Sequence, residues 1–317
     1  MKKVKTFLVQ LLFDKKIENF PEIHNNKFWD NLVKIGSNQR VIPAIYSKLK
    51  ERKLLNKIPL ELKEYLSEIY NFNTERNKNL LRESCEIEKK LNENKIKFIF
   101  LKGISLLKTV YKNNIGIRMM HDIDILVKKN QIYKARECLK DLQYKSEGLL
   151  INHRHLPRMI NSKKNIGIEL HHQSISNDIL KFDDNKIYKK ENKNILNIHD
   201  SIMLIILNSE VNDRGTLSGR IDLRSKFDFF QLNKLENNYD YNFYTKAFIT
   251  KMVYLKILEK TKDINSLYLI YLVLSKYFGL GFFISEFFIN IQRVKNFFKS
   301  KKYRIVVFNK IKNKIFK

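Results

Sequence analysis

Residues 118–127 read Arg118-Met-Met-His-Asp-Ile-Asp-Ile-Leu-Val127 and combine a strand pattern with two carboxylates. Because successive side chains of a strand point to opposite faces, Asp122 and Asp124 project to one side and the aliphatic residues to the other. Two acids this close repel each other unless a cation lies between them, and hard divalent ions such as Mg²⁺ prefer oxygen ligands. The pattern predicts a metal site beside a core strand, with a strand edge bearing solvated acids as the ordinary alternative.

A second pattern lies directly upstream. The apolar run Phe98-Ile-Phe-Leu101 predicts a strand that ends in Lys102-Gly103, and a helix is predicted from Ile104 to Tyr111. A glycine at a strand-to-helix turn lets the backbone approach a ligand, and a helix N-terminus adds partial positive charge, which together suit a phosphate. Lys102, Ser105 and Arg118 are candidates to add charge and hydrogen bonds. An ordinary turn at Gly103 and a surface cation at Arg118 are the competing interpretations.

A third acid follows in the run Ile166-Gly-Ile-Glu-Leu-His171. Glu169 projects away from the apolar face of this predicted strand, so a neighbouring strand can present it beside Asp122 and Asp124. Three converging carboxylates can hold two Mg²⁺ ions for in-line displacement at a phosphorus atom, one activating a hydroxyl and the other neutralising a triphosphate. We expect Asp122, Asp124 and Glu169 to be catalytic metal ligands, with Glu169 helping to take the proton of the hydroxyl.

The spaced elements LKG, R and DIDILV, at residues 101–127, resemble the polymerase-β-type nucleotidyltransferase superfamily. Within it they most resemble an uncharacterised bacterial nucleotidyltransferase family with LKG, R and DIDLLV motifs, and more distantly the AbiEii-type toxins. The resemblance covers roughly residues 20–235 and includes weaker elements at residues 41–49, 168–171 and 219–230. It implies a nucleoside triphosphate as substrate. It also implies that Asp122, Asp124 and Glu169 hold metal ions, while the nucleotide phosphates contact Lys102, Gly103, Ser105 and Arg118.

The chain departs from the superfamily pattern beside the predicted phosphate site. The superfamily usually has a second small residue directly after the glycine, whereas this chain has Ile104 there and Ser105 one position later. The step from Gly103 to Asp122 is also longer than in minimal members, so the intervening segment must fold back.

The flanking sequence favours helices over strands. Apolar residues recur at spacings of three and four between Phe28 and Lys48 and between Leu60 and Asn94, and this period returns after Ile195. We therefore predict an α+β protein whose small mixed sheet forms a nucleotidyltransferase core, flanked by N- and C-terminal helical segments. The predicted parts are an N-terminal helical module at 1–94, the core at 95–190 and a C-terminal helical module with a basic tail at 191–317.

Composition limits the partners and the compartment. The chain has 61 Lys and Arg against 33 Asp and Glu, a net charge of +28, which favours a polyanionic partner or substrate. A Lys- and Asn-rich composition accounts for part of this excess. Two cysteines exclude a disulfide framework and a thiolate zinc site. The N-terminus has no signal-peptide pattern and we predict no transmembrane segment, so cytoplasmic localisation is expected, with Leu267–Ser285 forming a buried helix pair.

The segment from Phe287 to Lys317 contains ten Lys or Arg and no acid, with aromatic residues among the cations. It could bind RNA through charge and stacking. The favoured alternative is that its aromatic residues pack inward while the lysines remain in water.

Histidines raise two further alternatives. His153, His155, His171 and His172 are close in sequence, but zinc requires a defined tetrahedral set, which this spacing does not establish. His171 shares strand parity with Glu169 and could touch substrate. The His-Asp pairs at 121–122 and 199–200 lack the helical context of a phosphohydrolase site.

The sequence therefore predicts an enzyme, a Mg²⁺-dependent nucleotidyltransferase that transfers a nucleoside monophosphate to a hydroxyl and releases pyrophosphate. RNA, a protein, an antibiotic or a sugar precursor are all open as acceptors, with RNA slightly favoured by charge. One alternative is a catalytically inactive nucleotidyltransferase-like module that binds RNA or a partner protein through its basic surface. A toxin with the same chemistry and a different acceptor is another.

Overall fold

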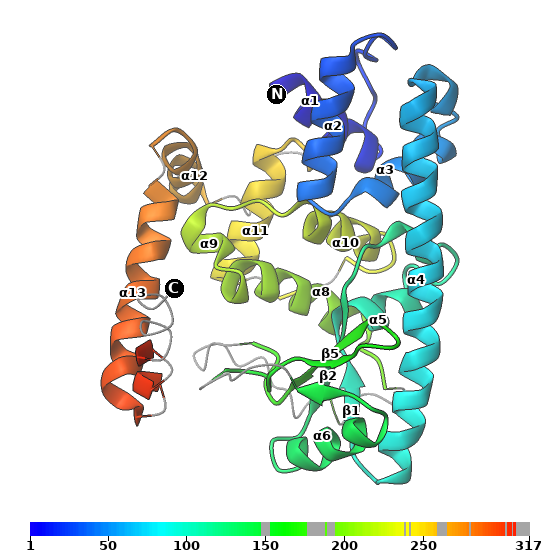
Figure 1. Ribbon diagram of the computed structural model, residues 1–317. Coiled ribbons are helices and arrows are strands. Elements are labelled where there is room, and N and C mark those ends of the chain that lie inside the picture. The colour runs from blue at the N-terminus through cyan, green and yellow to red at the C-terminus, as the bar shows by residue number, and fades with distance from the viewer. Residues whose placement is uncertain are drawn as a thin grey trace.

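A computed structural model describes residues 1–146, 153–175, 188, 194–237, 239–240, 242–258, 265–278, 280–301, 303–305 and 307–308. Helices surround one small sheet, with the long helix α4 on one side of the molecule and the helices α12 and α13 on the other (Figure 1). The predicted α+β class, a small mixed sheet flanked by N- and C-terminal helical segments, is confirmed.

The N-terminal segment is helical as predicted. It consists of α1 (Lys2–Leu12), α2 (Asn26–Asn38), α3 (Ile42–Glu51), the 3-10 turn η1 (Leu55–Lys57) and α4 (Leu60–Glu93). The apolar period from Phe28 to Lys48 does not form one helix, because the chain turns at Arg40, which has a left-handed φ of 55°. Arg40 thereby lies at a helix junction, where its side chain reaches the cleft described below.

The sheet contains five strands in the order β1-β2-β5-β4-β3. The strands are β1 (Phe98–Phe100), β2 (Asp122–Val127), β3 (Lys145–Ser146), β4 (Met159–Asn161) and β5 (Ile166–His171). Three of them, β1, β2 and β5, were predicted from the sequence. Only the central pair β2 and β5 is parallel, and its register places Asp124 opposite Glu169.

Two helices follow the strands, α5 (Lys102–Lys108) and α6 (Ile132–Asp141). Helix α5 begins two residues before the predicted range Ile104–Tyr111 and ends three residues short of it. Between α5 and β2 the chain forms the 3-10 turn η2 (Ile115–Ile117), which is held by two buried asparagines of α4. The Asn73 amide donates to the carbonyl oxygens of Gly116 and Arg118 at 2.7 and 3.1 Å, and the Asn77 amide donates to that of Arg118 at 2.9 Å. These bonds fix the backbone that enters β2, so a polar stripe on α4 positions Arg118.

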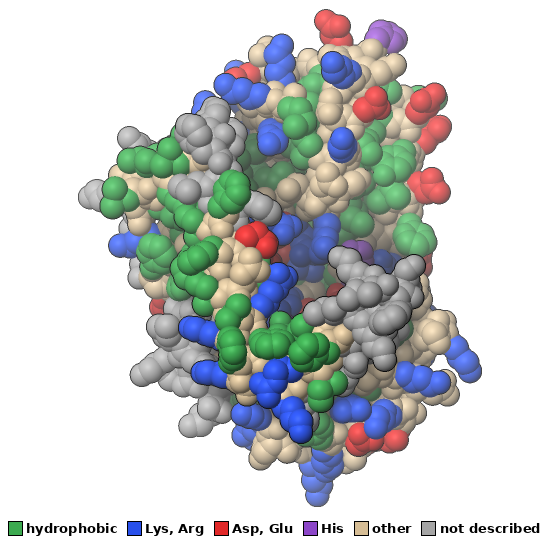
Figure 2. Space-filling view, turned by 60° about the vertical axis from the view of Figure 1, so that its left-hand side comes forward, with side chains coloured by type: hydrophobic (Ala, Val, Ile, Leu, Met, Phe, Trp, Pro, Cys, Tyr) green, Lys and Arg blue, Asp and Glu red, His purple; other side chains and the backbone are tan. Residues whose placement is uncertain are grey.

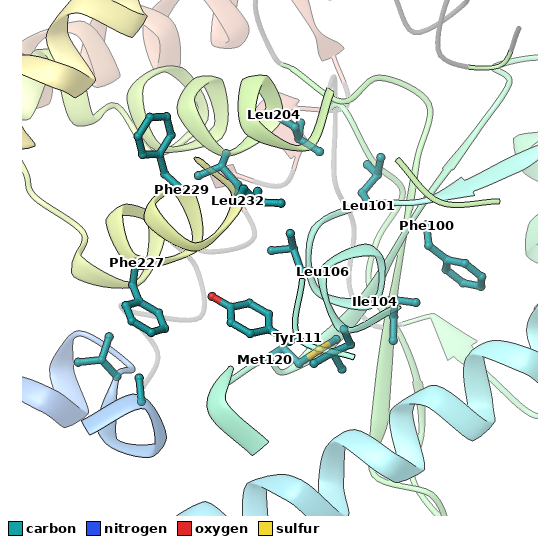
Figure 3. Close-up of a cluster of buried hydrophobic side chains, with 14 of the residues drawn as sticks. Phe100, Leu101, Ile104, Leu106, Tyr111, Met120, Leu204, Phe227, Phe229 and Leu232 are labelled. Carbon is teal, nitrogen blue, oxygen red and sulfur yellow. The ribbon is translucent and has the colours of Figure 1, made fainter. Parts of the chain in front are cut away.

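The C-terminal segment contains α8 (Ile198–Leu207), a π-helical turn η3 (Asn208–Asn212), α9 (Gly215–Ser218), α10 (Leu223–Asn233), α11 (Phe243–Tyr254), α12 (Ser266–Phe278) and α13 (Leu280–Lys299). Figure 3 shows how this segment joins the sheet: Leu204 of α8 and Phe229 of α10 face the same apolar cluster as Leu101 and Leu106. The cluster contains buried residues from all three predicted parts of the chain.

The predicted buried helix pair at Leu267–Ser285 is only half right. Helices form there, but the side chain of Leu267 is 79% exposed and that of Phe283 68% exposed. A small second cluster, formed by Ala247, Tyr268 and Leu272, covers one side of α12 and leaves its other side in solvent. Within the described part of the chain, no helix combines the length and the hydropathy needed to cross a bilayer.

A buried ion cluster stabilises the C-terminal segment. The Glu210 carboxylate on η3 lies 2.6 Å from Lys251 Nζ and 3.4 Å from Lys226 Nζ, and accepts a hydrogen bond from Thr216 at 2.9 Å. Lys226 Nζ also lies 2.9 Å from the centre of the Phe248 ring. All three charged side chains are almost completely buried, so two cations depend on one carboxylate.

Replacement of Glu210 by Gln is expected to lower the free energy of unfolding by about 3–5 kcal/mol, because it leaves two buried cations without an anion. Urea unfolding measures the change. Glu137→Gln is the control, because Glu137 is exposed and pairs only with Lys140 one helical turn away, and it is expected to change stability by less than about 0.5 kcal/mol. Equal stability of the two variants would contradict the assigned role of Glu210.

Burial lowers the pKa of Lys226 to about 7, whereas the unfolded chain holds this proton up to about 10.5. Between about pH 7 and pH 10.5 the unfolded state binds more protons than the folded state. The free energy of unfolding therefore rises as pH increases over this range. We expect the wild-type chain to gain about 2 kcal/mol relative to Lys226→Met between pH 7 and pH 9. Urea unfolding of both proteins at the two pH values tests this, and a constant difference would show that Lys226 keeps its proton.

Candidate active site

Three acids meet where β2 and β5 lie side by side. Asp122 and Asp124 share one face of β2, while the alternate residues Ile123 and Ile125 are fully buried on the other. The parallel register puts Glu169 next to Asp124, and ligand atoms of Asp124, Glu169 and His171 lie within 4.8 Å of one another. Among the described residues this group is the one found with the spacing of a metal site.

Two basic groups contact the central carboxylate. Lys102 Nζ lies 2.7 Å and His171 Nε2 2.9 Å from the same Asp124 oxygen, Oδ1. Lys102 adopts a left-handed φ of 43°, an uncommon conformation for a residue with a side chain, at the junction of β1 and α5. The turn aims the lysine at the acids, which gives a physical reason for local strain at this position.

The three acids differ in acidity. Burial opposes ionisation of Asp124, but Lys102 and His171 outweigh it and hold the pKa of Asp124 far below its usual range. Burial also opposes ionisation of Glu169, yet its hydrogen bond with His171 leaves the pKa lowered. Burial and the charges of Asp124 and Glu169 raise the pKa of Asp122. Two carboxylates with lowered pKa values and one with a raised pKa thus lie together, and a bound cation would favour the ionised form of all three.

A row of histidines lies behind the acids. The rings of His153 and His155 are 4.1 Å apart between centroids, and those of His155 and His171 are 4.9 Å apart. Burial lowers the pKa of His155 to about 4, so this ring is neutral near pH 7. Its Nε2 is 3.7 Å from Glu169. His155 therefore lies near Glu169, while His171 is the histidine of the row that belongs to the group with Asp124 and Glu169.

These acids line a cleft of about 290 Å³ that is rich in charged groups. Basic side chains gather in a hollow near the centre of the face shown in Figure 2. The cleft is lined by six basic residues and five acidic ones, which come from every part of the chain: Arg40, Lys102, Arg118, Arg154, Arg220 and Arg224, with Asp122, Asp124, Glu169, Asp213 and Asp222. A polar cavity with this balance suits a multiply charged anion together with cations.

Arg118 joins the core to the C-terminal helices. Its guanidinium lies 3.0 Å from the Asp228 carboxylate of α10, and both side chains are buried. The hydroxyl of Tyr111 donates to the same carboxylate at 2.8 Å, and burial keeps the pKa of Tyr111 well above its usual value. Asp228 therefore serves as the buried salt-bridge partner of Arg118.

Gly103 is required by close packing beside Arg118. A Cβ atom at this position would lie 2.8 Å from the sulfur of Met120 and 3.2 Å from Nη1 of Arg118. A larger residue would push the methyl end of Met120 aside and press against the Arg118 guanidinium. The glycine therefore preserves the space next to Lys102 and Arg118, whose side chains line the same cleft.

The structure brings six of the seven residues singled out from the sequence to this cleft: Lys102, Gly103, Arg118, Asp122, Asp124 and Glu169. Ser105 lies elsewhere. Its side chain is fully buried, and its hydroxyl accepts a hydrogen bond from the Leu196 amide at 3.1 Å. Ser105 therefore ties α5 to the segment before α8 and does not line the cleft.

Several cleft residues were missed from the sequence. Arg40, Arg154 and Asp213 stand in no recognisable motif, because folding brings them to the cleft from distant segments. Burial and the charge of Asp222 raise the pKa of Asp213, which faces Lys102 across the cleft lining. Arg220 lies in the segment 219–230 that weakly resembles the family. That resemblance was the sequence feature that could have pointed to this part of the cleft lining.

Replacement of Asp228 by Asn is expected to lower the free energy of unfolding by about 3–5 kcal/mol, because it leaves the Arg118 guanidinium buried without its anion. Tyr111→Phe removes one hydrogen bond to the same carboxylate and keeps the ion pair, so about 1 kcal/mol is expected. Urea unfolding compares the two. A smaller loss in Asp228→Asn than in Tyr111→Phe would contradict the importance of the ion pair.

Comparison with known proteins agrees with this geometry. A model of the family described as uncharacterised nucleotidyltransferase matches residues 25–206, more than half of the chain, and this match includes the strands that carry the three acids. Neither the curated proteins nor the solved structures gave a significant match. The extent of the match shows that the chain belongs to this uncharacterised nucleotidyltransferase family.

Proposed function

We propose that the chain transfers a nucleoside monophosphate from a nucleoside triphosphate to a hydroxyl group and releases pyrophosphate. The observation that carries this proposal is the pairing of Asp124 with Glu169 across parallel strands, at the wall of a cleft lined by six basic residues. Carboxylates suit divalent cations and the basic residues suit a triphosphate. An inactive binding module would need the basic surface but not the juxtaposed acids.

The donor set fits divalent magnesium. Asp124 and Glu169 offer oxygen atoms within 4.8 Å of each other, and Asp122 lies on the same face of β2. We assign Asp122, Asp124 and Glu169 as the ligands of up to two Mg²⁺ ions. Bound Mg²⁺ would neutralise phosphate charge and increase the acidity of the attacking hydroxyl.

Basic residues of the cleft would hold the triphosphate. Lys102 lies beside the acids, and Arg118 is held in the wall by Asp228, so both can contact phosphate oxygens without losing their positions. Gly103, next to Lys102, lets the backbone pack closely against Met120 and Arg118. Arg40 and Arg220 line the same cleft from the helical segments and extend the basic surface.

The reaction balances as an in-line displacement. The acceptor oxygen forms a bond to the α-phosphorus, the bond from that phosphorus to the β-bridging oxygen breaks, and pyrophosphate leaves. Glu169, kept ionised by His171, is positioned to accept the hydroxyl proton. The three acids are thus proposed as the catalytic residues, with Lys102, Gly103 and Arg118 around the nucleotide.

The acceptor is proposed by class. RNA, a protein side chain, an antibiotic and a sugar precursor each carry a suitable hydroxyl, and the net charge of +28 favours RNA among them. We further propose that the chain acts in the cytoplasm, where nucleoside triphosphates and Mg²⁺ are available.

Replacement of Asp124 by Asn is expected to abolish Mg²⁺-dependent nucleotidyl transfer, because Asp124 is a proposed metal ligand. The rate should fall by more than the roughly 10- to 100-fold seen when a residue that only supports a metal ligand is removed. The assay incubates the chain with each α-labelled nucleoside triphosphate and Mg²⁺, with and without EDTA, and measures pyrophosphate and label transfer. Asp141→Asn, at an exposed acid of α6, is the matched control and should retain full activity.

Activity that survives EDTA or the Asp124→Asn change would overturn the proposed mechanism. No turnover with any nucleotide, together with salt-sensitive RNA binding that is equal in both variants, would instead support the inactive binding module.

A further inference from the structure

The outer face of α13 exposes large apolar side chains. Phe283, Phe287 and Phe298 are 68%, 63% and 76% exposed, and Val294 is 56% exposed. Their spacings of four, seven and four residues place all four on one face of the helix. Burial of such side chains is normally favourable by more than 1 kcal/mol each, so a continuous exposed stripe marks an interaction surface.

Basic residues flank this apolar stripe. Arg293, Lys295 and Lys299 lie on the same helix and are exposed, and Lys301 continues beyond its end. From residue 287 to residue 317 the chain carries ten Lys or Arg and no acid. Figure 2 shows hydrophobic side chains gathered along this side of the molecule with basic side chains beside them. Glu286 is the one acid of α13, against Arg293, Lys295 and Lys299. The surface therefore combines an apolar stripe with a border that is positive on balance.

The opposite face of the helix pair is fixed to the body of the protein. Gly281 packs against the backbone of Ser218, where a side chain would not fit. The hydroxyl of Tyr268 donates to the Thr216 carbonyl oxygen at 3.0 Å, and that of Tyr271 donates to the Leu217 carbonyl oxygen. These contacts hold α12 and α13 on α9, so the stripe is directed outward by the fold.

The expectation that the aromatic residues of this segment pack inward is wrong for α13. Phe298 is among the most exposed large hydrophobic residues of the described chain. The inward contacts of the helix pair are made by small and polar-tipped residues such as Gly281 and Tyr268. The exposed phenylalanines remain available to a partner.

We propose that α13 docks the protein on a membrane surface rich in anionic phospholipids. A helix with an apolar face and flanking cations lies in the interface, with aromatic rings among the upper acyl chains and lysines at the headgroup phosphates. The partner is therefore anionic lipid, and the helix lies along the bilayer without crossing it. This inference does not depend on the proposed catalytic function.

Two other partners fit this surface less well. Single-stranded RNA binds aromatic rings by base stacking, but Val294 within the stripe and the exposed Ile270 of α12 have no ring to offer. A second copy of the chain would bring two strongly basic segments together, and like charges in an interface oppose association. An anionic bilayer satisfies both the apolar and the basic parts.

The experiment is co-sedimentation of the full chain with vesicles, without nucleotide. Vesicles of phosphatidylcholine alone are compared with vesicles in which phosphatidylglycerol replaces about a third of it. We expect binding to the anionic vesicles at least about tenfold stronger than to neutral ones, weakening as NaCl rises, because several lysines contact the surface.

Two double variants separate the apolar and basic contributions. Phe287→Ser/Phe298→Ser and Lys295→Glu/Lys299→Glu are each expected to weaken binding to anionic vesicles by about tenfold or more. The matched controls are Phe72→Ser on α4, an equally exposed phenylalanine, and Lys89→Glu/Lys97→Glu, which changes the net charge by the same amount. Both controls should bind as the wild-type chain does. All changed side chains are exposed, and circular dichroism melting confirms that each variant is folded.

Three outcomes would overturn the inference. The first is a wild-type chain that does not sediment with anionic vesicles. The second is a Lys89→Glu/Lys97→Glu control that loses as much binding as Lys295→Glu/Lys299→Glu, which would indicate net charge alone. The third is absence of vesicle binding together with RNA binding or self-association that the Phe287→Ser/Phe298→Ser change removes, which would assign the stripe to that partner.

Discussion

The parallel pairing of β2 with β5 determines where the carboxylates of the site lie. Its register holds the carboxylates of Asp124 and Glu169 side by side on a partly buried face, where like charges repel strongly. The fold supplies Lys102 and His171 to offset this repulsion. The same physical requirement, positive charge between adjacent acids, is what gives such a site affinity for divalent cations.

The walls of the cleft depend on contacts that cross the chain. Buried asparagines of α4 hold the backbone that leads into β2, and Asp228 of α10 holds the side chain of Arg118. Residues far apart in sequence therefore hold one arginine, at its backbone carbonyl and at its guanidinium. This explains why a protein with a very small sheet can keep a highly charged cleft in place: the helices on both sides provide the rigid partners.

Local patterns predicted the parts of the fold that depend on local physics. Strand alternation placed Asp122, Asp124 and Glu169 on one side of their strands, and the helical period located α4. The roles of these acids remain proposals, and their convergence depends on the parallel register of β2 and β5, which parity does not give. The short strands β3 and β4 were not predicted, since Lys145-Ser146 and Met159-Ile-Asn161 lack the apolar, β-favouring run that marked β1.

Tertiary contacts account for what the sequence did not predict. Ser105 has the right type and position for a phosphate ligand, but packing against the segment before α8 takes its hydroxyl. Arg40 reaches the cleft because the chain turns between α2 and α3, which the helical period conceals. The outward phenylalanines of α13 could not be distinguished from core residues by spacing, because an apolar face has the same period whether protein or another phase covers it.

The ion pair between Arg118 and Asp228 also shows that the stretch matched by the family model is shorter than the part of the chain that packs as one unit. The family match stops at residue 206, yet the anion that balances Arg118 lies twenty-two residues beyond it. A fragment trimmed to the matched stretch would lack α10 and so leave the Arg118 guanidinium without its carboxylate partner. The smallest autonomous piece of this enzyme family member is therefore longer than the stretch by which it is recognised, and any chimaera built at that boundary must carry α10 with it.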